Sequence, residues 1–225
     1  PPSLRPLVVM GRLIERRDAG QGGERLAAAL TRLGPSYVKF GQFLATRPDV
    51  VGAQIAEDLS RLQDRMPPFP RDAALKVVSA ALGQGWEKQF TAVSEPVAAA
   101  SIAQVHRATT TDGREMALKV LRPGMRAEFT RELAAMAAFA AFAERNSDEA
   151  RRLRLSGVVA TLARSVMLET DLRLEAAALS ELAVHSAEDK GIRVPKPDWE
   201  RTARDVLTAE WIEAAPLHDL AAIDA

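Results

Sequence analysis

Two short apolar runs separated by a polar turn form the most distinctive pattern in this chain. The first run ends near Ala108, and the second covers residues 116–121. Asp112-Gly113 lies between them, and glycine adopts the positive φ of a tight hairpin turn without steric cost. The alternation of apolar and polar residues on either side favours strands. The pattern therefore predicts a β-hairpin within residues 98–122.

Lys119 lies in the second of these runs. Side chains alternate between the two faces of a strand, so Lys119 shares a face with Ala117 and Leu121. A lone lysine in a strand is most often a solvated edge residue. This chain, however, uses arginine for most of its cations, and lysine suits a site that needs a compact point charge against phosphate. The thirty basic residues include only six lysines, namely Lys39, Lys76, Lys88, Lys119, Lys190 and Lys196.

Helical spacing of apolar residues dominates the remainder of the chain. It predicts helices over residues 4–14, 24–33, 36–46, 51–64, 72–82, 127–145, 155–187 and 216–222, and a strand over residues 205–212. The segment 66–70 is rich in proline and typical of a rigid extended linker. We therefore predict an α+β protein with an N-terminal helical extension over residues 1–70 and a second domain over residues 71–225.

The predicted helix 36–46 carries the tetrapeptide Lys39-Phe40-Gly41-Gln42. A glycine within a helix costs about 1 kcal/mol relative to alanine. Gly41 therefore suggests that another group packs very close to the helix backbone. The alternative is a loosely packed surface helix.

Three carboxylates lie in or beside the apolar stripe predicted for residues 155–187, namely Glu169, Asp171 and Glu175. A buried carboxylate is costly unless it is paired or hydrogen-bonded. The pattern thus predicts a helix whose acidic residues face the strand that carries Lys119. If the stripe drifts around the helix, the same acids are solvated.

Composition limits the classes of function. The 225 residues contain thirty acidic and thirty basic side chains, so there is no electrostatic case for binding nucleic acid. Because there is no cysteine, disulfides, thiolate nucleophiles and cysteine-based metal sites are excluded, and three scattered histidines do not form a metal-binding pattern. No apolar run approaches the roughly 18 residues of a transmembrane helix, so we expect no transmembrane segment in this chain.

The predicted order of elements is that of a protein-kinase small lobe, in which a strand lysine pairs with a helix glutamate. Residues 98–104 replace the usual glycine-rich loop with an alanine-rich one. The chain resembles the UbiB (AarF-type) family of atypical kinase-like proteins. Four motifs carry this resemblance: Lys39-Phe40-Gly41-Gln42, the alanine-rich segment 98–104, Ala117-Leu118-Lys119-Val120, and Glu169-Thr170-Asp171 with the downstream Glu175.

The resemblance implies a nucleotide site. Lys119 would contact phosphates and pair with Glu175, and the helix carrying Lys39 and Gln42 would cap the site, with Lys39 near Glu169 and Asp171. The ligand would be ATP or ADP with Mg²⁺. The nucleotide-binding residues would be Ala98, Ala99, Ala100, Ser101, Ile102, Val105, Ala117, Lys119, Glu210, Trp211 and Ile212, the last three through backbone groups around the adenine.

The alanine-rich loop also has a predicted consequence. Alanine resists the positive φ that glycine adopts freely, so the loop should be stiffer than a glycine-rich loop. This favours ATP hydrolysis or chemistry on a small molecule over phosphorylation of proteins.

The resemblance further implies a role in ubiquinone biosynthesis. The expected location is cytoplasmic and peripheral to the inner membrane of a bacterium, and the expected partners are lipids or other proteins of that biosynthesis.

The resemblance covers only part of a kinase-like protein. The catalytic loop and the metal-binding Asp and Asn follow the strand near Ile212 in this family, so we expect the large lobe and the metal ligands beyond residue 225. As given, the chain is not expected to turn over ATP. Two other interpretations stay open: a non-catalytic module that senses nucleotide or binds partner helices, and a helical scaffold in which Lys119 and the acids form structural ion pairs only.

Overall fold

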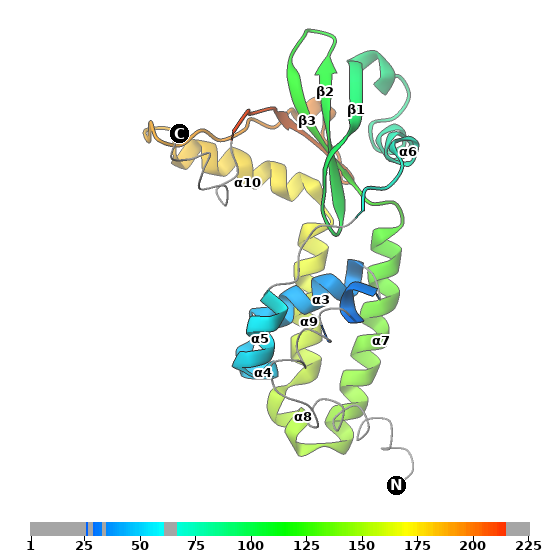
Figure 1. Ribbon diagram of the computed structural model, residues 1–225, viewed down its shortest axis with the longest axis vertical. Helices are drawn as coiled ribbons and strands as arrows, with labels where there is room; N and C mark the ends of the chain where they lie inside the picture. Colours follow the sequence, from blue (N-terminus) through cyan, green and yellow to red (C-terminus); the bar gives the residue numbers. More distant parts are fainter. Residues whose placement is uncertain (1–25, 27–28, 33–34, 61–66, 215–225) are drawn as a thin grey trace. The chain divides into compact units, whose positions relative to one another are not determined.

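The computed structural model describes residues 26, 29–32, 35–60 and 67–214 (Figure 1). The predicted helices 4–14 and 216–222 lie outside these residues. The chain divides into two compact units: a helical unit of residues 1–66 and 124–166, and a sheet unit of residues 67–123 and 167–225. The sequence-based division groups residues 124–166 with the second domain, whereas in the structure these helices belong to the same unit as the N-terminal ones.

The sheet unit is built on a four-stranded antiparallel sheet in the order β1-β2-β3-β4. In the part of this unit that the structure describes, two α-helices and two short 3₁₀ helices accompany the sheet. The elements in chain order are α6 (Arg71–Leu82), η2 (Trp86–Gln89), β1 (Phe90–Ala99), β2 (Ala103–Thr110), β3 (Glu115–Leu121), α10 (Leu172–His185), η3 (Trp199–Arg201) and β4 (Val206–Glu210).

The helical unit contains α3 (Pro35–Ala45), α4 (Pro48–Val51), α5 (Ala53–Ser60), α7 (Met125–Asn146), α8 (Asp148–Leu153) and most of α9 (Leu155–Glu169). Ser147 caps α8, because its hydroxyl accepts a hydrogen bond from the backbone N–H of Ala150. Arg154 then turns the chain into α9 with a φ of 51°. Leu30 and Leu59 form the centre of a small apolar core, and Tyr37 and Phe40 of α3 pack against it.

The predicted hairpin is present and joins β2 to β3. Gly113 has a φ of 82°, as the turn requires, and its N–H donates to the carbonyl of Thr110. The register places Val105 of β2 opposite Lys119 of β3, and Leu207 of β4 on the other side of Lys119. Tight hairpin closure therefore positions Lys119 in the middle of the sheet.

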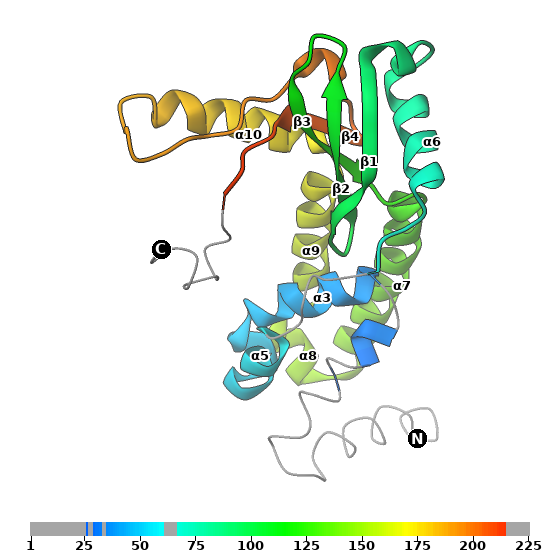
Figure 2. The same cartoon turned by 45° about the horizontal axis from the view of Figure 1, so that its top comes forward.

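The two faces of the sheet pack against different helices. Leu118 and Val120 are fully buried on the face covered by α6, together with Ala74 and Val78 of that helix. On the other face, Leu172 and Ala176 of α10 pack against the sheet, in a cluster completed by Leu121, Leu207 and Ala209. Figures 1 and 2 show α6 and α10 on opposite sides of the sheet. Lys119 belongs to the α10 face.

The structure corrects the sequence-based prediction at two helices. Helix α5 begins at Ala53 and not at residue 51, because Gly52, with a φ of 86°, separates it from α4. Residues 155–187 do not form a continuous helix, because α9 ends at Glu169 and α10 begins at Leu172. Asp171 has an extended backbone conformation between them, and its side chain accepts a hydrogen bond from the N–H of Arg173. The N–H of Leu172 donates to the carbonyl of Arg204 instead of continuing the helix.

Strand β1 was not predicted. It is an edge strand with mostly exposed or half-buried side chains, and its pairing with β2 is irregular around Pro96, which has no N–H to donate. A strand of this kind lacks the strong apolar alternation from which strands are predicted.

Candidate functional site

Lys119 and Glu175 form the ion pair at the centre of the candidate site. Lys119 Nζ lies 2.8 Å from both carboxylate oxygens of Glu175. The Lys119 side chain is 30% exposed and that of Glu175 is 43% exposed. A pair this accessible to solvent contributes only about 0–1 kcal/mol to folding. Its main effect is therefore to hold a cation in a fixed position, and the predicted pairing of these two residues is present.

The position of Glu175 follows from the way α10 packs. Leu172 and Ala176 are four residues apart on one face of the helix and are buried against the sheet. Leu179 continues that face. Glu175 lies three residues after Leu172 and four before Leu179, so it is held beside the apolar stripe and directed towards Lys119 on β3.

A cavity of about 420 Å³ surrounds this pair. Its walls come from the end of β1 and the residue after it, from β2, β3 and β4, from α10 and from the loop before β4, and they are mostly apolar. Such a cavity, with few polar groups, is typical of small-molecule sites. The lining residues are Ala98, Ala99, Ala100, Ala103, Val105, Ala117, Lys119, Glu175, Leu179, Pro195, Leu207, Ala209 and Glu210.

The alanine-rich segment forms one wall of the cavity and is held by backbone hydrogen bonds. The N–H of Ala100 donates to the carbonyl of Ala103 at 2.8 Å, and the N–H of Arg122 donates to the carbonyl of Ile102 at 2.8 Å. Among the described non-glycine residues only Arg154 has a positive φ, so this loop contains no left-handed residue. The loop therefore adopts a conformation that alanine tolerates well.

A buried polar network fixes the start of β2 below this loop. Gln104 is fully buried, and its side chain accepts from the N–H of Phe69 and donates to the carbonyl of Phe69. Gln104 Nε2 also lies 2.9 Å from His106 Nε2, and His106 Nδ1 lies 2.8 Å from the carbonyl oxygen of Ser94. Burial lowers the pKa of His106, which favours the neutral ring in this network.

Most of the predicted nucleotide-binding residues line the cavity, but four do not. Ser101 is buried at 1% exposure, and Ile102 packs against the core cluster beside α10. Trp211 stacks against Arg107, whose guanidinium carbon lies 5.1 Å from the centroid of the Trp211 ring. Trp211 and Ile212 are absent from the cavity wall, so the wall contains only Glu210 of the three predicted hinge residues.

Five lining residues were not predicted: Ala103, Leu179, Pro195, Leu207 and Ala209. Leu207 and Ala209 are two residues apart on β4, so the strand period that assigned Lys119 to a face could have identified them. Pro195 lies in an irregular loop, and no pattern in the sequence indicates its place.

The remaining predicted site residues lie on separate elements. Asp171 caps α10 and pairs with Arg173 at 2.7 Å, and this hydrogen bond lowers the pKa of the Asp171 carboxyl. Glu169 is the last residue of α9. Lys39 and Gln42 lie on α3 in the helical unit, where both are half-buried and the adjoining Gly41 is buried. Contact between Lys39 and the acidic residues stays a prediction.

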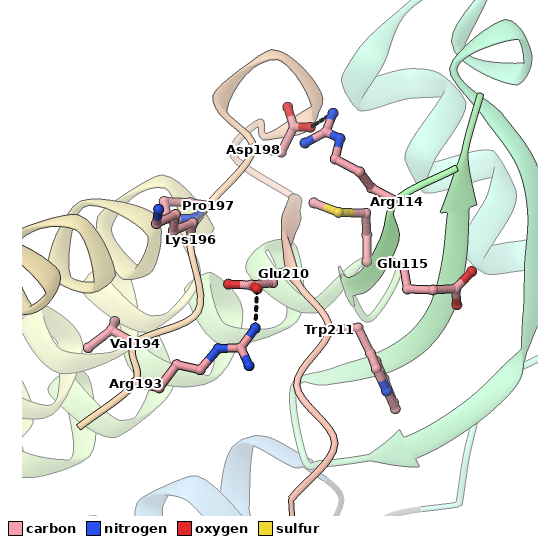
Figure 3. Close-up of a pocket in the computed structure, with 10 residues that line it drawn as sticks. Arg114, Glu115, Arg193, Val194, Lys196, Pro197, Asp198, Glu210 and Trp211 are labelled. Carbon is pink, nitrogen blue, oxygen red and sulfur yellow. Dashed lines mark hydrogen bonds and ion pairs between the residues drawn. The ribbon is translucent and has the colours of Figure 1, made fainter. Parts of the chain in front are cut away.

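A second cavity of the sheet unit lies at the C-terminal end of β4 and shares Glu210 with the Lys119 cavity (Figure 3). Its volume is about 670 Å³. Glu210 pairs with Arg193, which lowers the pKa of the Glu210 carboxyl. Arg114 contacts Asp198 at 3.1 Å, and Arg201 contacts the same carboxylate at 2.8 Å. Much of the charge in this cavity is thus already neutralised by ion pairs.

The described part of the chain contains neither a candidate metal cluster nor a helix that could cross a membrane. Within it, no group of three or more histidine, cysteine, aspartate or glutamate side chains is placed to hold a metal ion. None of the helices in the same residues is long and apolar enough to span a membrane.

Comparison with known proteins gives consistent results. The family model described as the ABC1 atypical kinase-like domain matches residues 61–225. A protein of Azotobacter vinelandii named "Probable protein kinase UbiB" is 41% identical over 212 residues, which are 94% of this chain and 40% of the relative. A protein of the same name from Marinobacter nauticus is 39% identical over 203 residues, 90% of this chain and 37% of the relative. The chain thus spans about two fifths of the length of these relatives.

A similar solved structure is the complex of Rv3197 with erythromycin from Mycobacterium tuberculosis. The TM-score is 0.54 and the sequence identity is 30%, over 94% of this chain and 52% of the other. The sheet, its helices and this similarity together show a kinase-like fold.

Proposed function

The chain belongs to the UbiB-type family of ABC1 atypical kinase-like proteins, and on that premise we propose that it provides the nucleotide-binding lobe of an atypical kinase-like ATPase. The observation that carries the proposal is the Lys119–Glu175 pair inside a mostly apolar cavity. The proposed ligand is ATP or ADP with Mg²⁺.

The pair leaves Lys119 able to bind phosphate. An ammonium group has three N–H donors, and the two oxygens of Glu175 accept two of them. The third donor and the positive charge are then available to a phosphate oxygen. Glu175 acts as a positioning residue, because it limits the directions in which the lysine side chain can point.

The apolar part of the cavity suits a planar base. Val105, Ala117 and Ala209 present small or branched apolar side chains from three adjacent strands. Such a surface favours a flat aromatic ring by burial of apolar area. We propose that the backbone of residues 210–212 provides the hydrogen bonds that select adenine.

The alanine-rich loop would restrict how the protein covers the terminal phosphate. Its backbone is held by hydrogen bonds and has no residue with positive φ among 98–104. We propose that this stiffness disfavours phosphate transfer to a protein substrate and favours hydrolysis or transfer to a small molecule.

Bound Mg²⁺ would neutralise part of the phosphate charge. The described residues contain no group of three metal-binding side chains, so we propose that its ligands come from other residues of the protein.

The biological setting is also proposed from the family. We infer a role in ubiquinone biosynthesis at the cytoplasmic side of a bacterial inner membrane, with lipids or proteins of that biosynthesis as partners. The helix carrying Lys39 and Gln42 would cap the nucleotide site near Glu169 and Asp171. A charge exchange, Lys39→Glu with Asp171→Lys, tests this pairing: recovery of nucleotide affinity in the double variant would support it, and additive losses would contradict it.

Calorimetric titration of this chain with ADP and ATP, each with Mg²⁺, tests the main proposal. Lys119→Met should weaken nucleotide affinity about tenfold or more, because a charge-assisted hydrogen bond is lost. Lys88→Met is the matched control, since Lys88 is exposed on η2 and absent from the cavity wall. No binding by the unaltered chain, or equal effects of the two variants, would contradict the proposal. Binding without hydrolysis by the longer protein would favour a nucleotide-sensing module.

A further inference from the structure

The helical unit contains a cavity of its own, of about 440 Å³, which shares no lining residue with the Lys119 cavity. It lies between α3, α4, α7 and α9. This volume is within the range of sites that bind small molecules. The lining residues are Tyr37, Phe40, Leu44, Val50, Val51, Glu132, Ala135, Met136, Phe139, Ala140, Leu155, Val158 and Val159.

Glu132 is the only charged residue among the lining residues that the structure describes. Its Oε2 atom is buried and has no hydrogen-bond partner among the residues that the structure describes. A buried carboxylate oxygen without a donor is energetically costly, because it has lost its hydrogen bonds to water and no hydrogen bond within the protein replaces them. The position of Glu132 on a wall that is otherwise apolar therefore points to a donor that enters the cavity from outside the chain.

The helix α7 presents Glu132 together with apolar neighbours. Ala135, Met136 and Phe139 follow Glu132 at intervals of three, four and seven residues, so all four lie on one face of the helix. Phe139 keeps 49% of its surface exposed, so part of this face of α7 is accessible from solvent.

Aromatic side chains also line this cavity. Tyr37 and Phe40 of α3 line the cavity with Phe139. A carboxylate with aromatic faces nearby is the environment that stabilises an ammonium group, through a charge-assisted contact and through cation–π attraction. A neutral apolar ligand would leave Glu132 Oε2 without a partner, and an anionic ligand would be repelled by it.

We propose that this cavity binds an amphiphilic cation, a molecule with an apolar body and one ammonium group that pairs with Glu132. The apolar body replaces water along α7 and α9, and the ammonium group supplies the partner that Glu132 Oε2 lacks. This proposal does not depend on nucleotide binding at Lys119.

Calorimetric titration of the chain with three probes of equal length tests the proposal. The probes are decylammonium, 1-decanol and decanoate, each below the concentration at which it aggregates. The cationic probe should bind about tenfold or more tighter than the neutral one, and the anionic probe should bind weakest. Because the apolar chains match, the ranking reports the charge preference of the site.

Two pairs of variants locate the binding. Glu132→Gln should remove the preference for the cation, whereas Asp58→Asn should keep it, since Asp58 also has a buried oxygen without a partner but does not line the cavity. Ala135→Phe should fill the cavity and weaken all binding that occurs there. Ala138→Phe is its control on the same helix, because Ala138 is exposed and outside the cavity wall.

The expected pattern is preference for the cation, lost in Glu132→Gln and reduced with overall affinity in Ala135→Phe. Three results would overturn the proposal: no binding of any probe, equal affinity for all three, or a cation preference that survives in Glu132→Gln. Circular dichroism of each variant separates loss of the site from loss of the fold.

Discussion

The two faces of the β-sheet are made from alternate residues of the same strands, yet they differ in how completely they are covered. On the α6 face, Leu118 and Val120 are fully buried, and the polar side chains of Gln104 and His106 are hydrogen-bonded inside the core. Lys119 lies between Leu118 and Val120 in the sequence, but its side chain is on the α10 face and borders a cavity. Neighbouring residues of β3 therefore have different roles, one in the closed core and the next at the cavity.

The comparison teaches that the two faces meet different energetic demands. A closed face gains stability from dense packing and from full satisfaction of its polar groups. An open face gains little stability from a solvent-accessible ion pair, so its polar residues are free to be placed for binding. We therefore expect variants on the α6 face to change the free energy of unfolding and variants on the α10 face to change ligand affinity.

The largest effect on stability is expected for Leu118→Ala. Removal of a fully buried leucine should lower the free energy of unfolding by about 2–5 kcal/mol, because it leaves a cavity in the core. The adjacent variant Lys119→Met should change it by about 1 kcal/mol or less. Urea unfolding of both variants checks this contrast. Similar losses in the two would show that the faces are not energetically distinct.

The next effect is expected for Gln104→Leu, on the closed face. Loss of the side-chain amide leaves the N–H and carbonyl of Phe69 without their partner and should cost about 1–3 kcal/mol. Hydrogen exchange at Phe69 should become faster. The control Gln89→Leu removes an amide from η2, for which no such buried hydrogen bonds are present in the described residues. Unchanged protection of Phe69 would contradict the role assigned to Gln104.

A smaller effect is expected for Asp171→Ala, which removes the cap of α10. The free energy of unfolding should fall by about 1 kcal/mol at neutral pH. The first turn of α10 should also become less ordered, so Glu175 would pair less firmly with Lys119. The pKa of Asp171 is lowered below 3.8, so its contribution to stability is present above that pH and is lost as the pH falls through the lowered pKa. The difference between the parent and Asp171→Ala should therefore shrink in acid.

Urea unfolding of both proteins across this pH range measures that difference. Asp72→Ala serves as the control, because Asp72 lies in the first turn of α6 and is exposed. A difference that stays constant into acid would show that the charge of Asp171 is not involved.

The smallest effect on stability is expected for Ala100→Gly in the alanine-rich loop. Added freedom of the unfolded chain should cost about 0.4–1 kcal/mol. The loop should also become more able to adapt to a third phosphate, which would change the ratio of ATP and ADP affinities. Calorimetry with both nucleotides checks this, with Ala92→Gly on exposed β1 as the control. An unchanged ratio would contradict the proposed effect of loop stiffness.

Some parts of the structure could be predicted from local patterns. The hairpin followed from Asp112-Gly113 between two alternating runs, and the structure has this turn between β2 and β3. The kinase-like fold and the family followed from the order of four short motifs, and both are confirmed. The face on which Lys119 lies followed from the strand period alone.

Other parts could not be predicted because they depend on contacts between distant segments. The break between α9 and α10 arises where Leu172 bonds to Arg204, a residue far along the chain. Strand β1 is stable because β2 pairs with it, although its own sequence is irregular. Pro195 lines the Lys119 cavity only because of the path of the loop before β4.

The sequence by itself determined the periodicities, the turn residues and the motif order, since these are encoded within a few neighbouring residues. Only the tertiary structure decided which polar groups found partners. It paired Lys119 with Glu175 across 56 residues and left Glu132 Oε2 buried without a partner among the described residues of the helical unit. The reason is physical: alternation fixes the direction of a side chain, whereas its partner is fixed by the packing of elements far apart in the chain.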